Sequence, residues 1–396
     1  MQSFDSKWRA LALVGVAELF AMTLWFSGSA VAPELAAAWA LSPVETAWLT
    51  NAVQVGFVVG ALVSASLTLA DVVRPRVLFS ASAFLGAAAT AVIAGFVTSG
   101  LPAIALRFVT GVALAGVYPT GMKMMAAWFD EGRGLAIGVL VGALTVGSAS
   151  PHLLRAVSGL GDPNQVLYGT AALAALGGVL VLAYEDGPHQ PSSAPFDPGA
   201  IRRIVTDRDV VFANLGYFGH MWELYAVWTW IPVYLGASLA AGGTPDAARV
   251  AAYLAFATIA VGGVGAWLAG SAADRWGRSL ITSVSMAVSG AACVLAGLVY
   301  AAPLAVVAPF VLVWGLVIVA DSAQFSAAVS ELAEESYVGS ALTLQTAVGF
   351  LLTTVSIQLL PLVQDAVGWR WAFAPLAVGP LVGIAAMLRL RARTGL

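Results

Sequence analysis

The stretch ELFAMTLW at residues 18–25 returns 205 positions later as ELYAVWTW at residues 223–230. Each copy lies in the middle of a hydrophobic stretch and places a glutamate, Glu18 or Glu223, where lipid excludes charge. The offset is close to half of the 396 residues. A repeat on this scale, with a costly carboxyl group at matching depth, is typical of membrane proteins built by duplication.

The composition excludes most other classes of protein. Hydrophobic residues make up 60% of the chain and charged residues only 10%, whereas soluble domains carry about 25% charged residues. The single cysteine, Cys293, rules out a disulfide framework, and the scattered histidines argue against a metal site. The sequence shows no nucleophile–base spacing or metal-ligand motif, so we expect neither an enzyme nor a cofactor. Its basic residues are scattered over short loops, which gives nucleic-acid binding no support.

Apolar runs of about 20 residues predict twelve transmembrane helices and therefore an all-α integral membrane protein. The predicted spans lie near residues 9–31, 44–69, 77–98, 101–126, 134–156, 166–184, 209–236, 248–272, 279–300, 304–328, 338–363 and 371–390. The first run contains Glu18 and is too long for a signal peptide, so we expect it to be retained. The polar, proline-rich segment 185–207 predicts a cytoplasmic linker between two six-helix bundles, 1–184 and 208–396.

Two further correspondences support the duplication. Asp71 and Asp274 follow the second and eighth spans at an offset of 203, and Gly111 and Gly315 lie in the fourth and tenth spans at an offset of 204. Nearly constant offsets predict two parallel repeats, related by an axis along the membrane normal.

The basic residues predict the orientation. If both termini share one side of the membrane, the other side holds only Arg155, Arg249 and Arg370. The side of the termini then holds Lys7, Arg9, Arg74, Arg76, Arg133, Arg202, Arg203, Arg208, Arg275, Arg278, Arg389, Arg391 and Arg393. The positive-inside rule therefore predicts cytoplasmic termini, and we expect a multi-pass protein of the bacterial inner (plasma) membrane.

The segment GSAADRWGR at 270–278 resembles the cytoplasmic loop signature of the major facilitator superfamily (MFS). The copy in the first half is degenerate, because Leu67 replaces the usual glycine and Val72 the usual arginine. The resemblance covers essentially the whole chain, and it implies two six-helix halves that alternate access to a midplane cavity. It also implies that the loop residues help to gate the cytoplasmic side, with Asp71 and Asp274 each meeting a helix N-terminus. The gating residues expected in this way are Asp71, Asp274, Arg275, Gly277 and Arg278.

A second family motif supports the resemblance. The fourth span contains RFVTG at 107–111, in which Arg107 precedes Gly111 by four positions. In the family this arginine is thought to act near proton transfer, so the resemblance implies such a role for Arg107. The fifth span lacks the Gly-Pro ending of drug antiporters, and the second and eighth spans lack the interior arginines of nitrate porters. We therefore assign no subfamily.

Glu18 and Glu223 are the expected proton-coupling residues. A charged carboxylate at mid-membrane costs about 3 kcal/mol or more, and binding a proton avoids that cost. A carboxyl group that gains and loses its proton as the cavity opens to either side can couple a solute to the proton gradient. Alternatively, each glutamate only hydrogen-bonds a neighbouring helix. His220 shares a helical face with Glu223 and forms either a proton relay or a static pair with it.

The expected solute-binding residues lie on the first, fourth, seventh and tenth spans. They are Trp25, Tyr118, Lys123, Tyr225, Asp321 and Gln324. Aromatic rings beside a carboxylate can hold an organic cation or a planar solute, but such rings also occur as interfacial anchors. Lys123 either binds an anion or snorkels to the interface. An ion pair between Lys123 and Asp321 is a further hypothesis, as an inner gate.

These features together predict a secondary active transporter for a small organic solute, with protons as the coupling ion. We expect it to act as a monomer in membrane lipid. One alternative is a uniporter, or an organic-anion symporter that uses Arg107 and Lys123. Another is a non-transporting membrane sensor with the same fold, which the lack of a large soluble domain makes less attractive.

Overall fold

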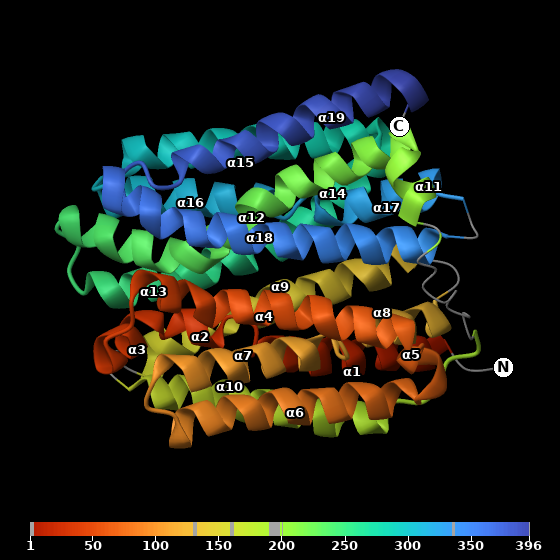
Figure 1. The fold of residues 1–396 in the computed structure, drawn as a ribbon, viewed down its shortest axis with the longest axis horizontal. Coiled ribbons are helices and arrows are strands. Elements are labelled where there is room, and N and C mark those ends of the chain that lie inside the picture. Colours follow the sequence, from red (N-terminus) through yellow and green to blue (C-terminus); the bar gives the residue numbers. More distant parts are fainter. Residues whose placement is uncertain are drawn as a thin grey trace. The chain divides into compact units, whose positions relative to one another are not determined.

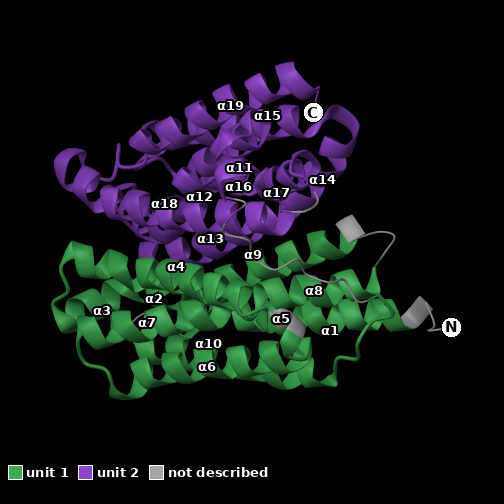
Figure 2. Ribbon diagram, turned by 45° about the vertical axis from the view of Figure 1, so that its right-hand side comes forward, with its two compact units in different colours: residues 1–193 green, residues 194–396 purple. Residues whose placement is uncertain are grey.

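The computed structural model describes residues 4–129, 133–158, 162–189, 199, 201–334 and 337–395. Helices dominate this part of the chain. Figure 2 shows that the chain divides into two compact units, unit 1 (residues 1–193) and unit 2 (residues 194–396). Much of the predicted linker, residues 190–198 and 200, lies outside the described residues.

Unit 1 runs from red to yellow-green in Figure 1. Its helices are α1 (Phe4–Met22), α2 (Ser27–Ala30), α3 (Ala32–Trp39), α4 (Pro43–Ser66), α5 (Leu69–Val72), α6 (Pro75–Phe96), α7 (Gly100–Leu114), α8 (Tyr118–Trp128), α9 (Arg133–Ser158), α10 (Pro163–Leu180) and the 3-10 helix η1 (Val181–Ala183).

Unit 2 runs from green to blue in the same figure. Its helices are α11 (Ile201–Thr206), α12 (Arg208–Ala241), α13 (Ala247–Ala260), α14 (Gly262–Trp276), α15 (Arg278–Val299), α16 (Leu304–Ile318), α17 (Ser322–Leu332), α18 (Val338–Val367), the 3-10 helix η3 (Ala374–Ala377) and α19 (Val378–Thr394).

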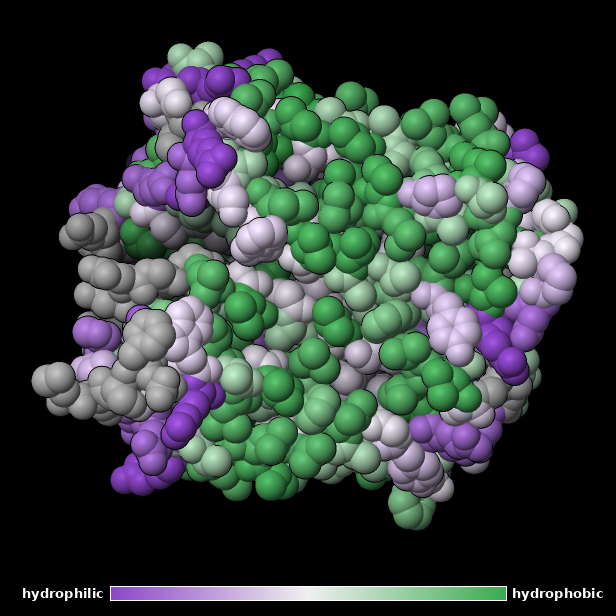
Figure 3. Space-filling model, turned by 180° about the vertical axis from the view of Figure 1, so that it is seen from behind, coloured by the Kyte–Doolittle hydropathy of each residue, from purple (hydrophilic) through white to green (hydrophobic). Residues whose placement is uncertain are grey.

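Eleven helical stretches in the described residues are long and apolar enough to cross a membrane, and they match all but the first predicted span. The fourth span consists of α7 and α8 with a break at 115–117, and the tenth consists of α16 and α17 with a break at 319–321. On the face drawn in Figure 3, hydrophobic residues cover the middle of the helices and hydrophilic residues gather at their ends. This is the surface that a lipid bilayer requires.

The first hydrophobic stretch differs from the continuous helix that we predicted over residues 9–31. Helix α1 carries Lys7, Arg9 and Glu18 and ends at Met22, after which residues 23–26 form turns before α2 begins. The sequence contains no proline or glycine at this break. Its cause is therefore a tertiary contact, which is described with the functional site.

Several spans begin with sequence-encoded caps. Ser42 and Glu45 form a capping box at α4, in which each side chain accepts a hydrogen bond from the other residue's backbone N–H. Asp207 caps α12 by accepting hydrogen bonds from the backbone N–H groups of Asp209 and Val210. These caps satisfy N–H groups that have no partner within the helix.

The packing of the two units repeats the duplication seen in the sequence. Helix α4 packs against α7 so closely that a Cβ atom on Gly111 would overlap the carbonyl oxygen of Val53. In unit 2, a Cβ atom on Gly315 of α16 would overlap the carbonyl oxygen of Thr258 in α13. The two contacts are related by offsets of 204 and 205, so the same glycine-mediated contact between spans occurs in both units.

A second contact between the same spans is also duplicated. A Cβ atom on Gly60 would lie 2.7 Å from the carbonyl oxygen of Val112, and one on Gly265 would overlap the carbonyl oxygen of Leu316. Small residues at these positions allow the backbones to approach, which is how helices associate in lipid.

We expect Gly111→Ala and Gly315→Ala to lower the melting temperature of the detergent-purified protein by several degrees. The added methyl group meets a backbone oxygen that cannot move alone, and overpacking of this kind costs about 1–3 kcal/mol. Gly169→Ala is the matched control, because its Cβ atom would meet only the end of the Leu154 side chain, with Cδ1 at 3.4 Å. Equal melting temperatures for all three variants would contradict the proposed role of the close helix contacts.

Candidate functional site

The break in the first span is held by Arg107, which extends from α7 and is 1% exposed. Its Nη1 donates hydrogen bonds to the Leu24 carbonyl oxygen (2.8 Å) and to Ser27 Oγ (2.9 Å). Its Nε donates to the Leu49 carbonyl oxygen (3.0 Å), and its Nη2 donates to that of Trp25. The break removes carbonyl groups from the helical ladder, and lipid offers them no donor. Short-range bonds such as Ser27 N to Leu24 O satisfy part of the break, and Arg107 adds donors to the carbonyl oxygens of Leu24 and Trp25.

The chemistry around Arg107 differs from a proton-coupling pair. Within the described residues, the partners of its guanidinium are carbonyl and hydroxyl oxygens rather than a carboxylate. Gly28 is part of the same arrangement, since a Cβ atom there would lie 3.0 Å from Arg107 Nε. The role of Arg107 in proton coupling, which the family resemblance implied, stays a prediction.

Glu18 is completely buried in unit 1. Neither of its carboxyl oxygens accepts a hydrogen bond from a described residue. The carboxyl group faces α8, where a Cβ atom on Gly121 would lie 2.6 Å from Glu18 Oε2, and it interacts electrostatically with Tyr118. Tyr118, an expected solute-binding residue, thus lies near the expected proton-binding group. A bare buried carboxylate is costly, so this environment suits a carboxyl group that carries a proton.

Unit 2 holds a larger buried polar cluster around Glu223, which is 1% exposed. Its Oε1 accepts a hydrogen bond from Ser289 Oγ (2.8 Å), and its Oε2 accepts one from Cys293 Sγ (3.3 Å), both on α15. Beside it, His220 Nδ1 lies 2.9 Å from Asp321 Oδ1, and both side chains are almost completely buried. Asp321 lies at the break between α16 and α17, so the broken tenth span brings a carboxyl group to the seventh.

The direct pair of His220 with Glu223, which their spacing allowed, is not formed in the described residues. His220 pairs with Asp321 instead, while Glu223 turns toward α15. Asp321 also interacts electrostatically with Glu223, so the three ionisable groups form one cluster. The sequence reasoning missed Ser289 and Cys293, although both are polar or reactive residues at i and i+4 on one helix face.

The two glutamates occupy equivalent positions in the repeat but different surroundings. Glu18 faces the fourth span through α8, whereas Glu223 faces the ninth span through α15. Glu18 has no hydrogen-bond donor among the described residues, and Glu223 has two. The two units therefore place a carboxyl group at equivalent positions of the repeat but surround it with different partners.

The expected aromatic residues are packed inside their units. Trp25 is 2% exposed and lies 5.1 Å from Phe57, measured between ring centroids. Tyr225 lies between Trp228 (5.7 Å) and Phe350 (5.1 Å). These contacts are ordinary aromatic packing distances. The solute-binding role of Trp25 and Tyr225 stays a prediction.

The loop signature forms an ion-pair network at one end of unit 2. Arg278 Nη2 donates to Glu331 Oε1 at 2.6 Å, and Arg278 Nη1 donates to Gln324 Oε1 at 2.7 Å. Gly277 has a φ of +88°, a conformation that favours glycine at the sharp turn between α14 and α15. Gln324, an expected solute-binding residue, is thus engaged by a loop arginine, which links the tenth span to the loop.

Other expected contacts remain predictions. Asp274 and Arg275 are exposed, and the helix terminus that Asp274 was expected to meet belongs to the other unit. The side chain of Asp71 lies outside the described residues. Lys123 is half-buried on α8, and its expected ion pair with Asp321 would also join the two units.

We expect Arg107→Gln to accelerate amide hydrogen exchange in residues 23–27 by about tenfold or more. Hydrogen bonds from a charged donor contribute about 1.5–3 kcal/mol each, and the shorter neutral side chain cannot replace all of them. Arg155→Gln is the matched control, because it removes an arginine of unit 1 that pairs with Glu34 instead. Unchanged exchange in Arg107→Gln would show that the break is stable without this side chain.

We expect His220→Gln and Asp321→Asn to be non-additive in a double-mutant cycle on thermal stability. Residues in direct contact couple by about 0.5–3 kcal/mol, and burial places this pair toward the upper end. A cycle of His220→Gln with Asp274→Asn serves as the control, because Asp274 is exposed at the end of α14. Additivity in both cycles would mean that His220 and Asp321 do not interact.

Comparisons with known proteins find solved structures with the same fold. The chain superimposes on a bacterial homologue of the human lysosomal transporter Spinster with a TM-score of 0.76, 13% identity, and coverage of 99% of this chain and 98% of that one. It superimposes on the nucleoside transporter NupG with a TM-score of 0.74, 13% identity, and coverage of 96% and 99%. For the xylose transporter XylE from E. coli, the TM-score is 0.74, the identity 13%, and the coverage 97% and 98%.

At this identity the structural likeness shows the fold alone, and it confirms the predicted all-α, two-bundle membrane architecture. A search of curated proteins found no match to the sequence. The family model described as Major Facilitator Superfamily matches residues 13–357, which is most of the chain. The resemblance carried by the loop signature and the fourth-span motif is thereby confirmed, and the chain belongs to the Major Facilitator Superfamily.

Proposed function

We propose that this protein is a proton-coupled secondary transporter of a small organic solute. Its family and its transporter-like fold support transport of a small molecule by alternating access, rather than an enzymatic activity. The proton coupling is our inference. The observation that carries it is the complete burial of Glu18 without a hydrogen-bond donor among the described residues.

Glu18 is suited to a step that links proton binding to conformation. While the group is buried, it cannot ionise without a large energetic cost, because neither water nor a donor compensates the charge. It can release its proton only in a conformation that admits water. Gly121 and Tyr118 of α8 lie against this carboxyl group, so movement of the fourth span is the natural event that opens it.

Glu223 provides a second proton-binding position in unit 2. Its hydrogen bonds to Ser289 and Cys293 hold it in place, and the pair formed by His220 and Asp321 lies in the same cluster. Because Asp321 interacts electrostatically with Glu223, a proton bound by one of these groups changes the charge that the others experience. This cluster supports the proposal that unit 2 also takes part in coupling.

The geometry favours this proposal over an organic-anion symporter that uses Arg107. That guanidinium already donates four hydrogen bonds to oxygen atoms of unit 1. An anion would have to displace these bonds and leave the broken first span unsatisfied. A uniporter remains the rival that experiment must separate from the proposed mechanism.

We further propose that both termini lie in the cytoplasm of a bacterium and that the protein acts as a monomer in its inner membrane. The basic residues at the helix ends support this orientation through the positive-inside rule. One chain carries both units, so a single copy contains the complete repeat.

The test is a measurement of solute-driven proton movement in proteoliposomes that contain a pH-sensitive dye. The first panel consists of nucleosides, pentoses, hexoses, organic cations and organic anions. We expect at least one solute to change the internal pH, and we expect Glu18→Gln to reduce this signal to the level of protein-free vesicles. Downhill exchange of the same solute should survive in Glu18→Gln, because the amide keeps the shape of the protonated group. Glu223→Gln is expected to weaken coupling as well.

Glu185→Gln is the control, because Glu185 is exposed after the sixth span. Solute flux without proton movement would establish a uniporter. Proton movement that persists in Glu18→Gln would remove Glu18 from the coupling role.

A further inference from the structure

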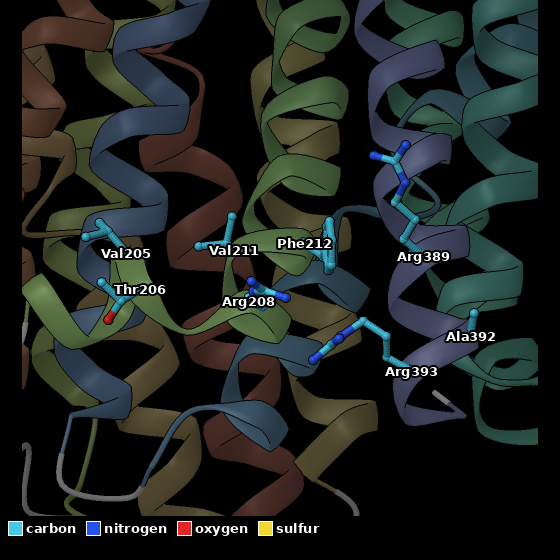
Figure 4. Close-up of a pocket in the computed structure, with 8 residues that line it drawn as sticks. All are labelled: Val205, Thr206, Arg208, Val211, Phe212, Arg389, Ala392 and Arg393. Carbon is cyan, nitrogen blue, oxygen red and sulfur yellow. The ribbon is translucent and has the colours of Figure 1, made fainter.

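A cavity of about 510 Å³ opens in unit 2 where α11, the beginning of α12 and the end of α19 meet (Figure 4). Its volume is that of a site for a small ligand, since such pockets measure roughly 300–1,000 Å³. Eight residues line it: Val205, Thr206, Arg208, Val211, Phe212, Arg389, Ala392 and Arg393. The proposed transport mechanism uses none of them.

The lining of this cavity is amphipathic. Val205, Val211 and Phe212 form an apolar part, and three arginines form a cationic part. Figure 4 shows Arg208 and Arg393 extending toward one another from α12 and α19, whereas Arg389, one turn before Arg393 on α19, points away from these two arginines in this view. A ligand that matches both parts is an anion attached to an apolar body.

The positive charge of the cavity is only partly neutralised by the protein. Arg393 Nε donates to Asp209 Oδ1 at 2.5 Å, so this arginine already has a carboxylate partner. Asp207 also lies near Arg393, and its side chain accepts hydrogen bonds as the cap of α12. Among the described residues, Arg208 and Arg389 have no ion-pair or hydrogen-bond partner. Two guanidinium groups therefore remain for an external anion.

The position of the cavity indicates where the ligand comes from. Arg208 is the first residue of α12, and Arg389 and Arg393 lie at the end of α19, so the arginines mark the boundary between lipid and water. Val205, which lines the cavity, is 57% exposed, and Leu388, the residue before Arg389 in the chain, is 49% exposed. The cavity thus opens where phospholipid headgroups lie, and apolar surface for acyl chains adjoins it.

We propose that this cavity binds the phosphate-bearing headgroup of an anionic phospholipid, through Arg208 and Arg389. Arginine binds phosphate through paired N–H groups, and each contact is strengthened by charge. Basic pockets between transmembrane helices bind anionic headgroups when they face the cytoplasmic leaflet, and the proposed orientation places this end of unit 2 there. The Arg393–Asp209 pair joins α12 to α19 and forms one wall of the site.

The test is a native mass spectrometry titration of the full-length, detergent-purified protein. The probes are phosphatidylglycerol, phosphatidylcholine and inorganic phosphate, each added separately. We expect phosphatidylglycerol to form a retained one-to-one adduct in preference to the zwitterionic lipid. The double variant Arg208→Gln/Arg389→Gln is expected to bind phosphatidylglycerol at least about thirtyfold more weakly, because it loses the charge-assisted hydrogen bonds that the two arginines donate to the phosphate.

The matched control is Arg202→Gln/Arg391→Gln, which removes two exposed arginines from the same end of unit 2 but outside the cavity lining. Its affinity should stay within a factor of about three of the wild type, because charge alone is screened at the surface. Arg389→Lys keeps the charge but loses the paired N–H groups, and its binding should be intermediate.

Three results would overturn the proposal. Equal binding of phosphatidylcholine would show that headgroup charge is not recognised. Retention of inorganic phosphate at the same affinity would identify a free anion rather than a lipid as the ligand. Equal losses in the two double variants would show a diffuse surface charge instead of a site. The lipid preference of the wild-type protein decides the question even if a variant fails to fold.

Discussion

Lipid cannot hydrogen-bond a peptide group, and this constraint determines how the helices of the protein can be interrupted. The first span is broken at residues 23–26, and the side chain of Arg107 donates to the carbonyl oxygens released there. The fourth and tenth spans are broken at 115–117 and 319–321, where short-range backbone hydrogen bonds form, such as Gly116 N to Ala113 O. Bonds of this kind also form in the first span, such as Leu24 N to Ala21 O, so Arg107 adds to them there. Each of these three interruptions has hydrogen bonds that compensate it, and each lies close to a residue of the candidate site.

The breaks give the buried carboxyl groups their surroundings. Asp321 meets His220 because the tenth span stops at Ile318 and restarts at Ser322. Glu18 faces the beginning of α8 just after the break in the fourth span, and Gly121 leaves room for its carboxyl group. In unit 1 the carboxyl group has no donor from the described residues, whereas in unit 2 the equivalent group has two. The duplicated scaffold therefore carries two chemically different buried acids.

The positions of most helices could be predicted from the sequence because a bilayer requires about 20 apolar residues. The repeat offset paired Gly111 with Gly315, and the structure shows that the two glycines make equivalent close contacts. The partners inside the bundle could not be predicted in the same way. Arg107 binds backbone oxygens, which have no signature in the sequence. The direction in which Glu223 turns depends on packing against α15, and its spacing from His220 suggested a different partner. Spacing determines which residues share a face, but the bend of a neighbouring span determines what they meet.

Cys293 is the only cysteine of the chain, it is 1% exposed, and its sulfur lies 3.3 Å from the carboxyl group of Glu223. A thiol-specific reagent can therefore label the unmodified protein at one place only, directly beside the buried acid of unit 2. The extent of alkylation becomes a record of how often water and small molecules enter that interior. The native chain thus contains its own reporter of opening, without an engineered probe.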